Sequence, residues 1–329
     1  MAHGRRRVSG ERPRPVVDTA YLSIQGDSHA VTIPTLALDL GGTRMRGALV
    51  WPDGTVTDRV VEPTPRDQPC ANALHQLMRA VAADAGGEGF DSVVVGVPGR
   101  VDYGAGRLEY APNLPPGWRD ELDVESLSSA IGRPVSLAND GDMAAVGEAL
   151  FGAGQSYRDV VYVTFSTGVG AGVVLDGQLV RARRSLGEIG HTVLLRADAD
   201  GAAATVEALA SGTALDREST RAGLLVAGAE MVARVRAGDA GATAVLDGVA
   251  EAIAATVVNL AHLFSPDVVV VGGGLGRNLD LFGWQVSAAL ERYGPRDLAA
   301  PILVTQASLG DDSGLVGAAG WGAATGLSR

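Results

Sequence analysis

Lysine is missing from this sequence, and all 27 cationic side chains are arginines. The absence of lysine excludes a phosphate-binding loop of the Walker type, because that loop uses a lysine to reach the terminal phosphates of a nucleotide. Cysteine is nearly missing as well. Cys70 stands alone, which excludes an internal disulfide and any zinc site built from two or more thiolates. A phosphate site in this chain must therefore use backbone amides, arginine or a metal ion.

Long apolar runs are also missing. The apolar stretches are strand-sized or interrupted by glycine, and the basic residues near the start are not followed by the apolar core of a signal peptide. We therefore expect a cytoplasmic protein without a membrane span. Residues 1–33 are predicted to form a flexible tail, because arginines, prolines and scattered polar residues offer too little apolar surface to offset chain entropy.

The composition favours a globular protein of about two domains, since the chain has 329 residues and is 46% hydrophobic. Its formal net charge of -11 argues against nucleic-acid or membrane partners. A basic tail that touches nucleic acid is the alternative. The same negative charge would repel a nucleotide unless Mg²⁺ and backbone amides neutralised the phosphates.

Strands and helices are predicted to alternate along the chain, which favours the α/β class. A first lobe at 34–139 contains strands at Leu36–Leu40, Arg46–Trp51 and Ser92–Val97, a helix at Ala71–Ala85 and a short strand at Val135–Leu137. A second lobe at 140–311 contains helices at Asp142–Phe151 and Ala244–Phe264 and strands at Val160–Phe165, Gly172–Leu175 and Val268–Val271. A last helix near 312–326, centred on Gly314–Ala324, is expected to pack back on the first lobe.

Three of the predicted strands run into glycine turns. In the first turn, Asp39 and Thr43 flank Gly41 and Gly42. Such a turn can direct backbone N–H groups at a phosphate, while the acid holds a hydrated cation. The alternative is a hairpin whose glycines only supply positive φ. Two more junctions, VVYVTFSTGVGAGVVL at 160–175 and PDVVVVGGGLG at 266–276, favour a nucleotide cleft over unrelated hairpins.

Two other segments carry candidate polar groups. Asp140 follows a strand and precedes a helix, so its carboxylate could serve as a general base in a cleft while Asn139 contacts a neighbouring hydroxyl. The alternative is an Asn-Asp helix cap. Glu188 and His191, in GEIGH at 187–191, suit two adjacent sugar hydroxyls. The alternative there is a salt bridge from Glu188 to a nearby arginine, 183 or 184.

The motifs together resemble the ROK family of bacterial sugar kinases and sugar-responsive repressors. They are DLGGT at 39–43, GVPGRVD at 96–102, ND at 139–140, STGVGAG at 166–172, GEIGH at 187–191 and GGG at 272–274. The likeness runs from about Pro34 to Gly326. It implies the actin-like ATPase (ribonuclease H-like) fold, with two α/β lobes and a cleft between them. A homodimer is also expected from the resemblance.

The resemblance assigns roles to individual positions. Asp140 is the implied catalytic base. The implied substrate-binding residues are Gly99, Arg100, Asn113, Asn139, Asp140, Glu188, His191 and Glu207. The implied nucleotide-binding residues are Asp39, Gly41, Gly42, Thr43, Thr167, Gly168, Gly272, Gly273 and Gly274. Asp39 is expected to hold Mg²⁺ through water.

One segment departs from the family pattern. Many ROK kinases carry C-x-C-G-x-x-G-C after the histidine of G-E-I-G-H and bind zinc there, whereas residues 192–206 read TVLLRADADGAAATV. A thiolate zinc site cannot form, so no zinc is expected and another group must orient His191. This departure makes a substrate other than glucose more plausible.

The resulting expectation is ATP- and Mg²⁺-dependent phosphorylation of a hexose at its 6-hydroxyl group, with glucose as the default substrate. An amino-sugar kinase acting on kanosamine, glucosamine or N-acetylmannosamine is the alternative of the same class. A sugar-sensing regulator that binds ligand without turnover is the alternative of another class, and polyphosphate is an alternative donor. The sequence leaves the choice among these open.

Overall fold

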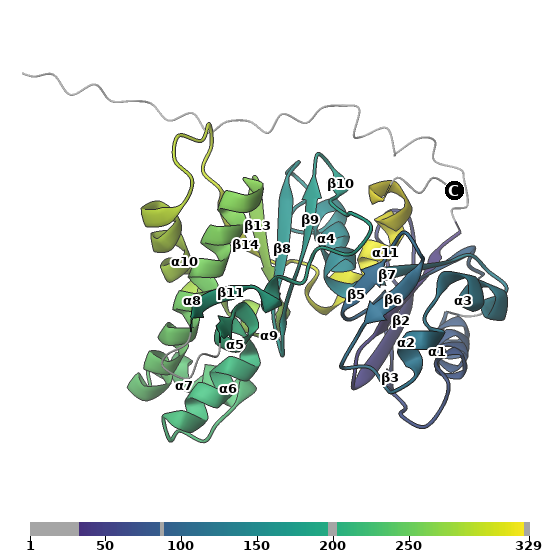
Figure 1. Ribbon diagram of the computed structural model, residues 1–329, viewed down its shortest axis with the longest axis horizontal. Helices are drawn as coiled ribbons and strands as arrows, with labels where there is room; N and C mark the ends of the chain where they lie inside the picture. Colours follow the sequence, from purple (N-terminus) through teal and green to yellow (C-terminus); the bar gives the residue numbers. More distant parts are fainter. Residues whose placement is uncertain (1–32, 86–88, 197–202, 326–329) are drawn as a thin grey trace, which may run out of the picture. The chain divides into compact units, whose positions relative to one another are not determined.

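Two five-stranded sheets organise the protein, one from each half of the chain (Figure 1). This computed structural model describes residues 33–85, 89–196 and 203–325, so the tail predicted for residues 1–33 lies almost entirely outside the described residues. The first sheet has the order β3 (Val60–Pro63), β2 (Arg44–Val50), β1 (Thr35–Leu40), β4 (Ser92–Val97) and β7 (Val135–Asn139). The second has the order β10 (Gln178–Leu179), β9 (Val169–Leu175), β8 (Val160–Phe165), β13 (Val268–Gly272) and β14 (Leu303–Gln306).

The two sheets share one topology. In the first, β1 pairs antiparallel with β2 and parallel with β4, β2 pairs antiparallel with β3, and β4 runs parallel to β7. In the second sheet, β8 takes the place of β1. It pairs antiparallel with β9, which pairs antiparallel with β10. On its other side β8 pairs parallel with β13, which runs parallel to β14. The carboxyl ends of parallel strands meet at one edge of a sheet, where open α/β sheets bind ligands. The loops after β1, β7, β8 and β13 lie at such edges.

Helices α4 (Asp140–Phe151) and α11 (Ser313–Ala324) pack between the two sheets. One buried core joins them to residues of both sheets, such as Ala37 of β1 and Tyr162 of β8. Because side chains alternate along a strand, Leu36 points instead into a separate core on the outer face of the first sheet. Helix α11 also contacts β1 and β2, so the C-terminal helix lies against the first sheet.

The remaining helices and short strands complete the outer layers. On the side of the first sheet these are α1 (Cys70–Asp84), β5 (Arg100–Asp102), β6 (Arg107–Tyr110), α2 (Trp118–Glu121) and α3 (Val124–Ile131). On the side of the second sheet they are η2 (Ile189–His191), β11 (Val193–Arg196), β12 (Ala203–Thr205), α5 (Val206–Ala210), α6 (Gly212–Arg221), α7 (Gly228–Arg236), α8 (Ala240–Phe264), α9 (Gly273–Gly276) and α10 (Leu279–Tyr293). The short helix η3 (Gly310–Asp312) leads into α11.

Helix α8 is long and apolar enough, by length and composition, to cross a membrane. However, 56% of its most apolar window is buried inside the protein. Its residues Leu246, Ile253 and Val257 belong to the core of the second sheet, together with β8 and β13. Packing within the protein therefore accounts for its apolar composition.

The strands predicted from apolar runs occur in the structure. Those at Ser92–Val97 and Val160–Phe165 match β4 and β8 in full, and the others differ at their ends. The predicted strand at Gly172–Leu175 begins earlier, at Val169, because glycines 170 and 172 pair within the ladder opposite β8. The helix predicted at Ala244–Phe264 begins at Ala240, after the side chain of Asp239 caps its first turn.

Helices α4 and α11 cross at very short range because both carry glycine at the crossing. A Cβ atom at Gly317 would overlap the carbonyl oxygen of Met143, and one at Gly147 would overlap that of Ser313. Backbone carbonyls held in helices cannot move aside as the end of a flexible side chain can. The distance between the two sheets therefore depends on the absence of side chains at these two positions.

We predict that Gly317→Ala destabilises the protein, with Gly314→Ala as the matched control on the same helix. Both substitutions favour the helix by about 1 kcal/mol, but only Gly317→Ala forces α4 and α11 apart, at a cost of about 2–3 kcal/mol. A Cβ at Gly314 would lie 3.8 Å from the methyl group of Met143, which is an ordinary van der Waals contact. Thermal unfolding should show a lower Tm for Gly317→Ala and an unchanged or higher Tm for Gly314→Ala. Equal Tm values would contradict the prediction.

Candidate active site

The turn between β1 and β2 approaches other backbone segments closely. The Gly41 N–H donates to the carbonyl oxygen of Arg44 at 2.9 Å, and a Cβ at Gly41 would lie 2.8 Å from that oxygen. A Cβ at Gly42 would overlap the carbonyl oxygen of Asn113. Neither glycine adopts a positive φ, so the turn needs them for space. The hairpin interpretation based on positive φ is therefore wrong, and Thr43 is exposed at the tip of the turn.

Asp39, near the end of β1, carries the carboxylate predicted to hold hydrated Mg²⁺. Its side chain is 14% exposed and forms an ion pair with Arg46, which lies opposite it on β2. Arg46 Nε donates to Asp39 Oδ2 at 3.0 Å, and Nη2 donates to the same oxygen. Partial burial lowers the pKa of Arg46, but the carboxylates of Asp39, Asp311 and Asp312 together outweigh this and raise that pKa above its ordinary value. This pair was not predicted from the sequence, although the predicted hairpin places the two residues opposite each other.

Asn139 and Asp140 connect β7 to α4. Asn139 is buried and caps α4, since its Oδ1 accepts a hydrogen bond from the Asp142 N–H at 3.0 Å. Its side-chain nitrogen, Nδ2, donates hydrogen bonds to the Gly99 carbonyl oxygen at 2.8 Å and to Asp140 Oδ1 at 3.2 Å. Asp140 Oδ1 also accepts from the Gly141 N–H at 2.8 Å. The capping alternative thus applies to Asn139. Among the described residues, none donates to Asp140 Oδ2, which leaves that oxygen available to a substrate proton.

Asp140 is exposed at the end of β7, but the protein packed around it restricts the hydration of its carboxylate. This surrounding protein raises the pKa of Asp140 to about 7, with further contributions from the carboxylates of Asp39, Glu188 and Asp142. A carboxyl group with a pKa near neutral is well matched to proton transfer at neutral pH. The mutual influence of these charges also places the predicted metal-side acid, the predicted base and a predicted sugar-binding acid near one another.

A further carboxyl group, that of Asp142, is buried behind Asp140 at 1% exposure. Asp142 Oδ2 accepts a hydrogen bond from the Tyr103 hydroxyl at 2.7 Å, and that hydroxyl oxygen accepts from the Asn139 N–H at 3.1 Å. Asp142 Oδ1 has no partner among the described residues. Burial raises the pKa of Asp142 to about 7, and the Glu188 charge contributes in the same direction. No local motif in the sequence marks Asp142 as buried, so its role was not predicted.

We predict that Asp142→Asn stabilises the protein at pH 8 but much less at pH 5. The folded-state pKa lies above the unfolded value, so stability falls as the pH rises from about 4 to about 7 and stays reduced above that window. Asparagine removes this penalty, and its oxygen can still accept from Tyr103. The loss of a favourable helix N-terminal charge offsets only about 0.5 kcal/mol. We expect a net gain on the order of 2 kcal/mol at pH 8. A Tm equal to or below that of the wild type at pH 8 would contradict this.

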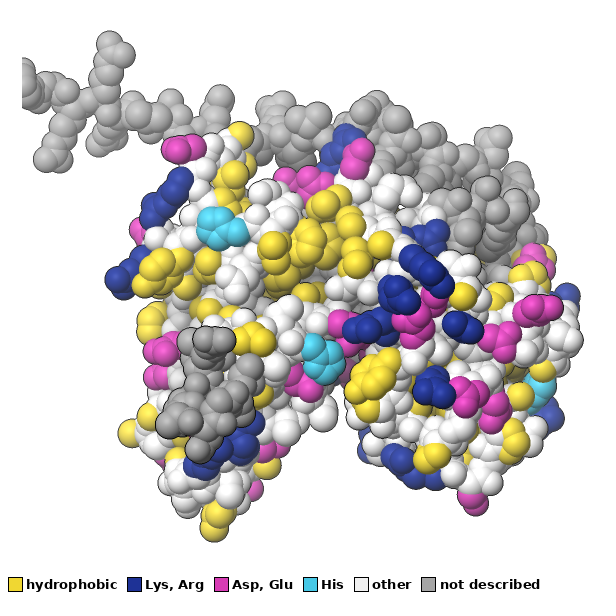
Figure 2. Space-filling model, in the orientation of Figure 1, with side chains coloured by type: hydrophobic (Ala, Val, Ile, Leu, Met, Phe, Trp, Pro, Cys, Tyr) yellow, Lys and Arg dark blue, Asp and Glu magenta, His cyan; other side chains and the backbone are white. Residues whose placement is uncertain are grey.

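Glu188 and His191 contact each other across η2. Glu188 Oε2 lies 3.4 Å from His191 Nε2, and the histidine side chain is 56% exposed. Arg183 and Arg184 pair instead with acids of β5 and β6, so the salt bridge considered for Glu188 does not form with either arginine. On the face shown in Figure 2, the surface is hollowed between the two lobes, and histidine and acidic side chains gather at the margin. Among the described residues, Glu188 is the acid within ion-pair distance of His191.

Glu207 begins the first turn of α5 and touches the second glycine turn. Its Oε2 accepts a hydrogen bond from the Val169 N–H at 3.1 Å, and a Cβ at Gly168 would overlap that same oxygen. A Cβ at Gly190, within GEIGH, would lie 3.4 Å from the Glu207 Cβ. One predicted phosphate turn and two predicted sugar-binding segments therefore meet at Glu207.

The third glycine cluster ends β13 and begins α9. Gly273 has φ +84, a left-handed conformation that strongly favours glycine. A Cβ at Gly274 would lie 3.9 Å from the Ser166 hydroxyl oxygen, and the neighbouring Thr167 is exposed. Because β8 and β13 are adjacent, the second and third clusters form one continuous edge. Gly272, the last residue of β13, lies against the ring of Tyr162.

The first-lobe loops contribute unequally to this region. Gly99 has φ +90, and its carbonyl binds Asn139. Asn113 is exposed beside the Gly42 turn. Arg100 is exposed on β5, where its positive charge acts on Glu109. No described contact joins Arg100 to Asp140, so its role in substrate binding stays a prediction.

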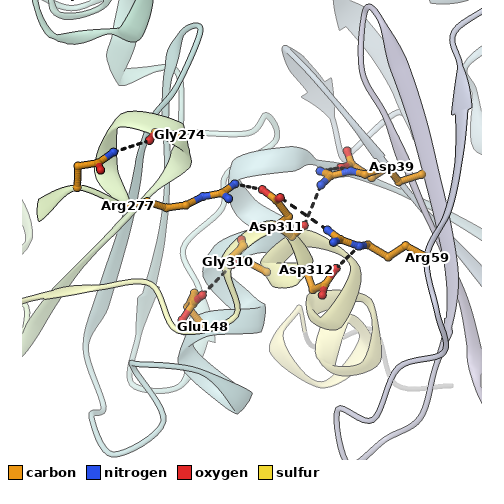
Figure 3. Close-up of polar contacts among 11 residues, drawn as sticks. Asp39, Arg59, Glu148, Gly274, Arg277, Gly310, Asp311 and Asp312 are labelled. Atoms are coloured by element: carbon orange, nitrogen blue, oxygen red, sulfur yellow. Dashed lines mark hydrogen bonds and ion pairs between the residues drawn. The ribbon is translucent and has the colours of Figure 1, made fainter. Parts of the chain in front are cut away.

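An acidic turn after β14 connects elements of both lobes (Figure 3). Asp311 pairs with Arg277, which follows α9, and its carboxylate lies 3.8 Å from Arg59 of the first lobe. Asp312 pairs with Arg59 at 3.2 Å. The buried Glu148 of α4 anchors this turn by accepting hydrogen bonds from the Ser308 N–H at 3.1 Å, the Leu309 N–H at 3.0 Å and the Ser313 hydroxyl at 2.7 Å.

Comparison with known proteins shows to which family a chain of this architecture belongs. The model of the ROK family matches residues 35–324. The chain belongs to the ROK family. It is similar to a glucokinase of Thermotoga maritima, with 29% identity over 86% of this chain and 95% of the relative. It is also similar to an N-acetylmannosamine kinase of Haemophilus influenzae, with 31% identity over 87% of this chain and 94% of the relative.

A solved structure is similar over nearly the same span. The ROK family glucokinase from Streptomyces griseus, in complex with glucose and AMPPNP, has a TM-score of 0.75 and 28% identity, covering 88% of this chain and 98% of the other. The two sheets of equal topology, with α4 and α11 between them, are the actin-like ATPase fold of this ROK protein. The fold predicted from the motifs is confirmed.

Proposed function

We propose that the protein transfers the γ-phosphoryl group of ATP to the 6-hydroxyl group of a hexose. The observation that carries this proposal is the position of Asp140. Burial raises the pKa of its carboxyl group to about 7, and the charges of Asp39, the proposed metal-side acid, and Glu188, a proposed sugar-binding acid, contribute to that shift. The chain is a kinase of hexoses or amino sugars, as its ROK relatives are. The 6-position, a cytoplasmic location and a homodimeric assembly are parts of the proposal.

In the proposed reaction, Asp140 accepts the proton of the sugar hydroxyl while that oxygen bonds to the γ-phosphorus. The bond from the γ-phosphorus to its bridging oxygen breaks, and ADP leaves. Glu188, His191 and Glu207 hold the other hydroxyls, which aligns the attacking oxygen with phosphorus. Asn139 fixes Asp140 Oδ1, so that the free Oδ2 faces the substrate. The glycine turns supply backbone amides for the phosphates.

The residues present fit a Mg²⁺ ion that arrives with the nucleotide. Mg²⁺ in such sites takes one or two carboxylates, with water and phosphate oxygens completing the shell. Asp39 offers one partly exposed carboxylate, and the described residues contain no group of three side chains able to form a full metal cage. When bound, the ion would neutralise phosphate charge in this acidic protein.

An amino sugar is the second candidate substrate, and the carboxylates favour it. The Glu188 charge contributes to the raised pKa values of Asp140 and Asp142, and an ammonium group on the sugar would offset this repulsion between carboxylates. The relationship to an N-acetylmannosamine kinase agrees with a substrate modified at nitrogen, although an N-acetyl group carries no charge. Comparing turnover of a sugar with a free amino group and of an N-acetylated sugar therefore distinguishes the two kinds of amino sugar.

The proposed function is tested by sugar-dependent release of ADP from ATP. Glucose, glucosamine, kanosamine and N-acetylmannosamine would be compared by kcat/KM, and the product would be analysed by NMR for phosphate at O6. Replacing ATP by polyphosphate tests the alternative donor. Sugar binding without any nucleotide consumption would overturn the proposal and support a sensor instead.

A further inference from the structure

Arg46 forms an ion pair with Asp39, the carboxylate that is proposed to hold the metal ion. The Asp39 side chain faces Arg46 in the hairpin register, and its Oδ2 receives both Nε and Nη2. Arg46 Nη1 donates to the carbonyl oxygen of Asp311 at 2.9 Å. A guanidinium has five N–H groups, and these contacts use three of them. The side chain is 31% exposed, so the remaining groups can reach a ligand.

The pairing between Arg46 and Asp39 conflicts with binding of the nucleotide. A hydrated divalent cation at Asp39 would repel a guanidinium bound to the same carboxylate, because like charges at this range disfavour each other. Arg46 would then lose its direct carboxylate partner and keep only the Asp311 carbonyl oxygen and the weaker influence of the Asp311 and Asp312 charges. A partly buried charge without a close counter-ion is costly. An anionic ligand that arrives together with the metal supplies the replacement partner. The terminal phosphate of the nucleotide is such a ligand.

The position of Arg46 points to the phosphate that is transferred. Its partner Asp39 lies close enough to influence Asp140, and the transferred group must lie beside Asp140 during the reaction. Arg59 and Arg277, the other arginines of this cluster, bind the carboxylates of Asp311 and Asp312 instead of Asp39 (Figure 3). The chain has no lysine that could take this role.

We infer that Arg46 binds the terminal phosphate of the nucleotide, exchanging its partner Asp39 for that phosphate when the metal–nucleotide complex enters. This inference rests on the proposed kinase function and assigns a phosphate-binding residue to it. A planar guanidinium can bind two phosphate oxygens at once and stabilise their charge as the phosphoryl group moves. In the free protein Asp39 keeps Arg46 ordered at that place.

The test measures nucleotide binding by calorimetry with AMPPNP and with ADP, each in the presence of Mg²⁺, for the wild type, Arg46→Gln and Arg46→Lys. Arg59→Gln is the matched control, since it removes the same charge from the same cluster without touching Asp39. We expect Arg46→Gln to weaken AMPPNP binding at least about 10-fold and ADP binding less than about 3-fold. Arg46→Lys should restore part of the difference, and Arg59→Gln should keep wild-type values.

Turnover supplies a second readout. Arg46→Gln should lower kcat about 100-fold or more with the KM for sugar nearly unchanged. Equal loss of AMPPNP and ADP affinity, or wild-type affinity for both, would overturn the inference. The proposed function would survive that result if the wild type still released ADP in response to sugar. If the wild type turned over no sugar, a selective loss of AMPPNP binding would still support the role of Arg46.

Discussion

Asp140→Asn is expected to lower kcat by about 1,000-fold while the protein still binds sugar and AMPPNP. A general base contributes on the order of 10²–10⁴ to rate, and asparagine cannot accept the hydroxyl proton. It is, however, close in shape to aspartate, and its oxygen can still accept from the Gly141 N–H. Binding should therefore be retained, as shown by calorimetry with each ligand alone.

The pH dependence supplies the internal control for this variant. In the wild type, kcat/KM for the nucleotide should fall as the pH drops below about 7, since protonated Asp140 is no longer a base. The residual activity of Asp140→Asn should lack this acidic limb. Turnover within about 10-fold of the wild type, or an unchanged acidic limb in the variant, would remove Asp140 from the mechanism.

Glu148→Ala is expected to produce the largest loss of stability. Glu148 is fully buried at 0% exposure, and it accepts hydrogen bonds from the turn at 308–313 and from the Ala153 N–H at 2.9 Å. Alanine would leave these donors buried without partners, at a cost of about 1–3 kcal/mol for each unsatisfied group before relaxation. We expect a net loss of about 4–5 kcal/mol, measured by chemical denaturation.

Two controls accompany the Glu148 variant. Glu148→Gln keeps the shape and one strong acceptor, so it should lose clearly less stability than alanine. Glu251→Ala replaces an exposed glutamate on α8 and should change stability by less than about 0.5 kcal/mol. If Glu148→Ala were as stable as Glu251→Ala, the anchoring role of Glu148 would be wrong. Loosening of this turn should also weaken the ion pair between Asp311 and Arg277.

Sequence patterns predicted the local elements well where burial is continuous. The apolar runs that became β4 and β8 are flanked by polar residues or proline, and both ends of each strand were predicted correctly. Short elements such as β5 and β6 were missed. They pair with each other as a local hairpin, with Val101 opposite Leu108 and Asp102 opposite Arg107, but strands of three and four residues are too short to show a period.

The chemical character of the candidate site was predicted in part. The glycine turns followed from strand-to-glycine junctions, and Asp140 was favoured by its motif. The environment that raises its pKa was not predictable, because it comes mainly from burial by the surrounding protein, with smaller contributions from the acids at positions 39, 188 and 142. The same holds for Gly42, whose need for glycine arises from the Asn113 carbonyl, far away in sequence.

By itself, the sequence determined the α/β class, the family and the absence of a lysine-based phosphate loop, since these depend on residue types and local order. Only the tertiary structure decided that Asp39 is paired with Arg46, that Asp142 is buried and that Glu148 anchors the acidic turn. The physical reason is that burial and electrostatic coupling depend on distances between atoms. Those distances are set by the packing of α4 and α11 between two sheets that lie far apart along the chain.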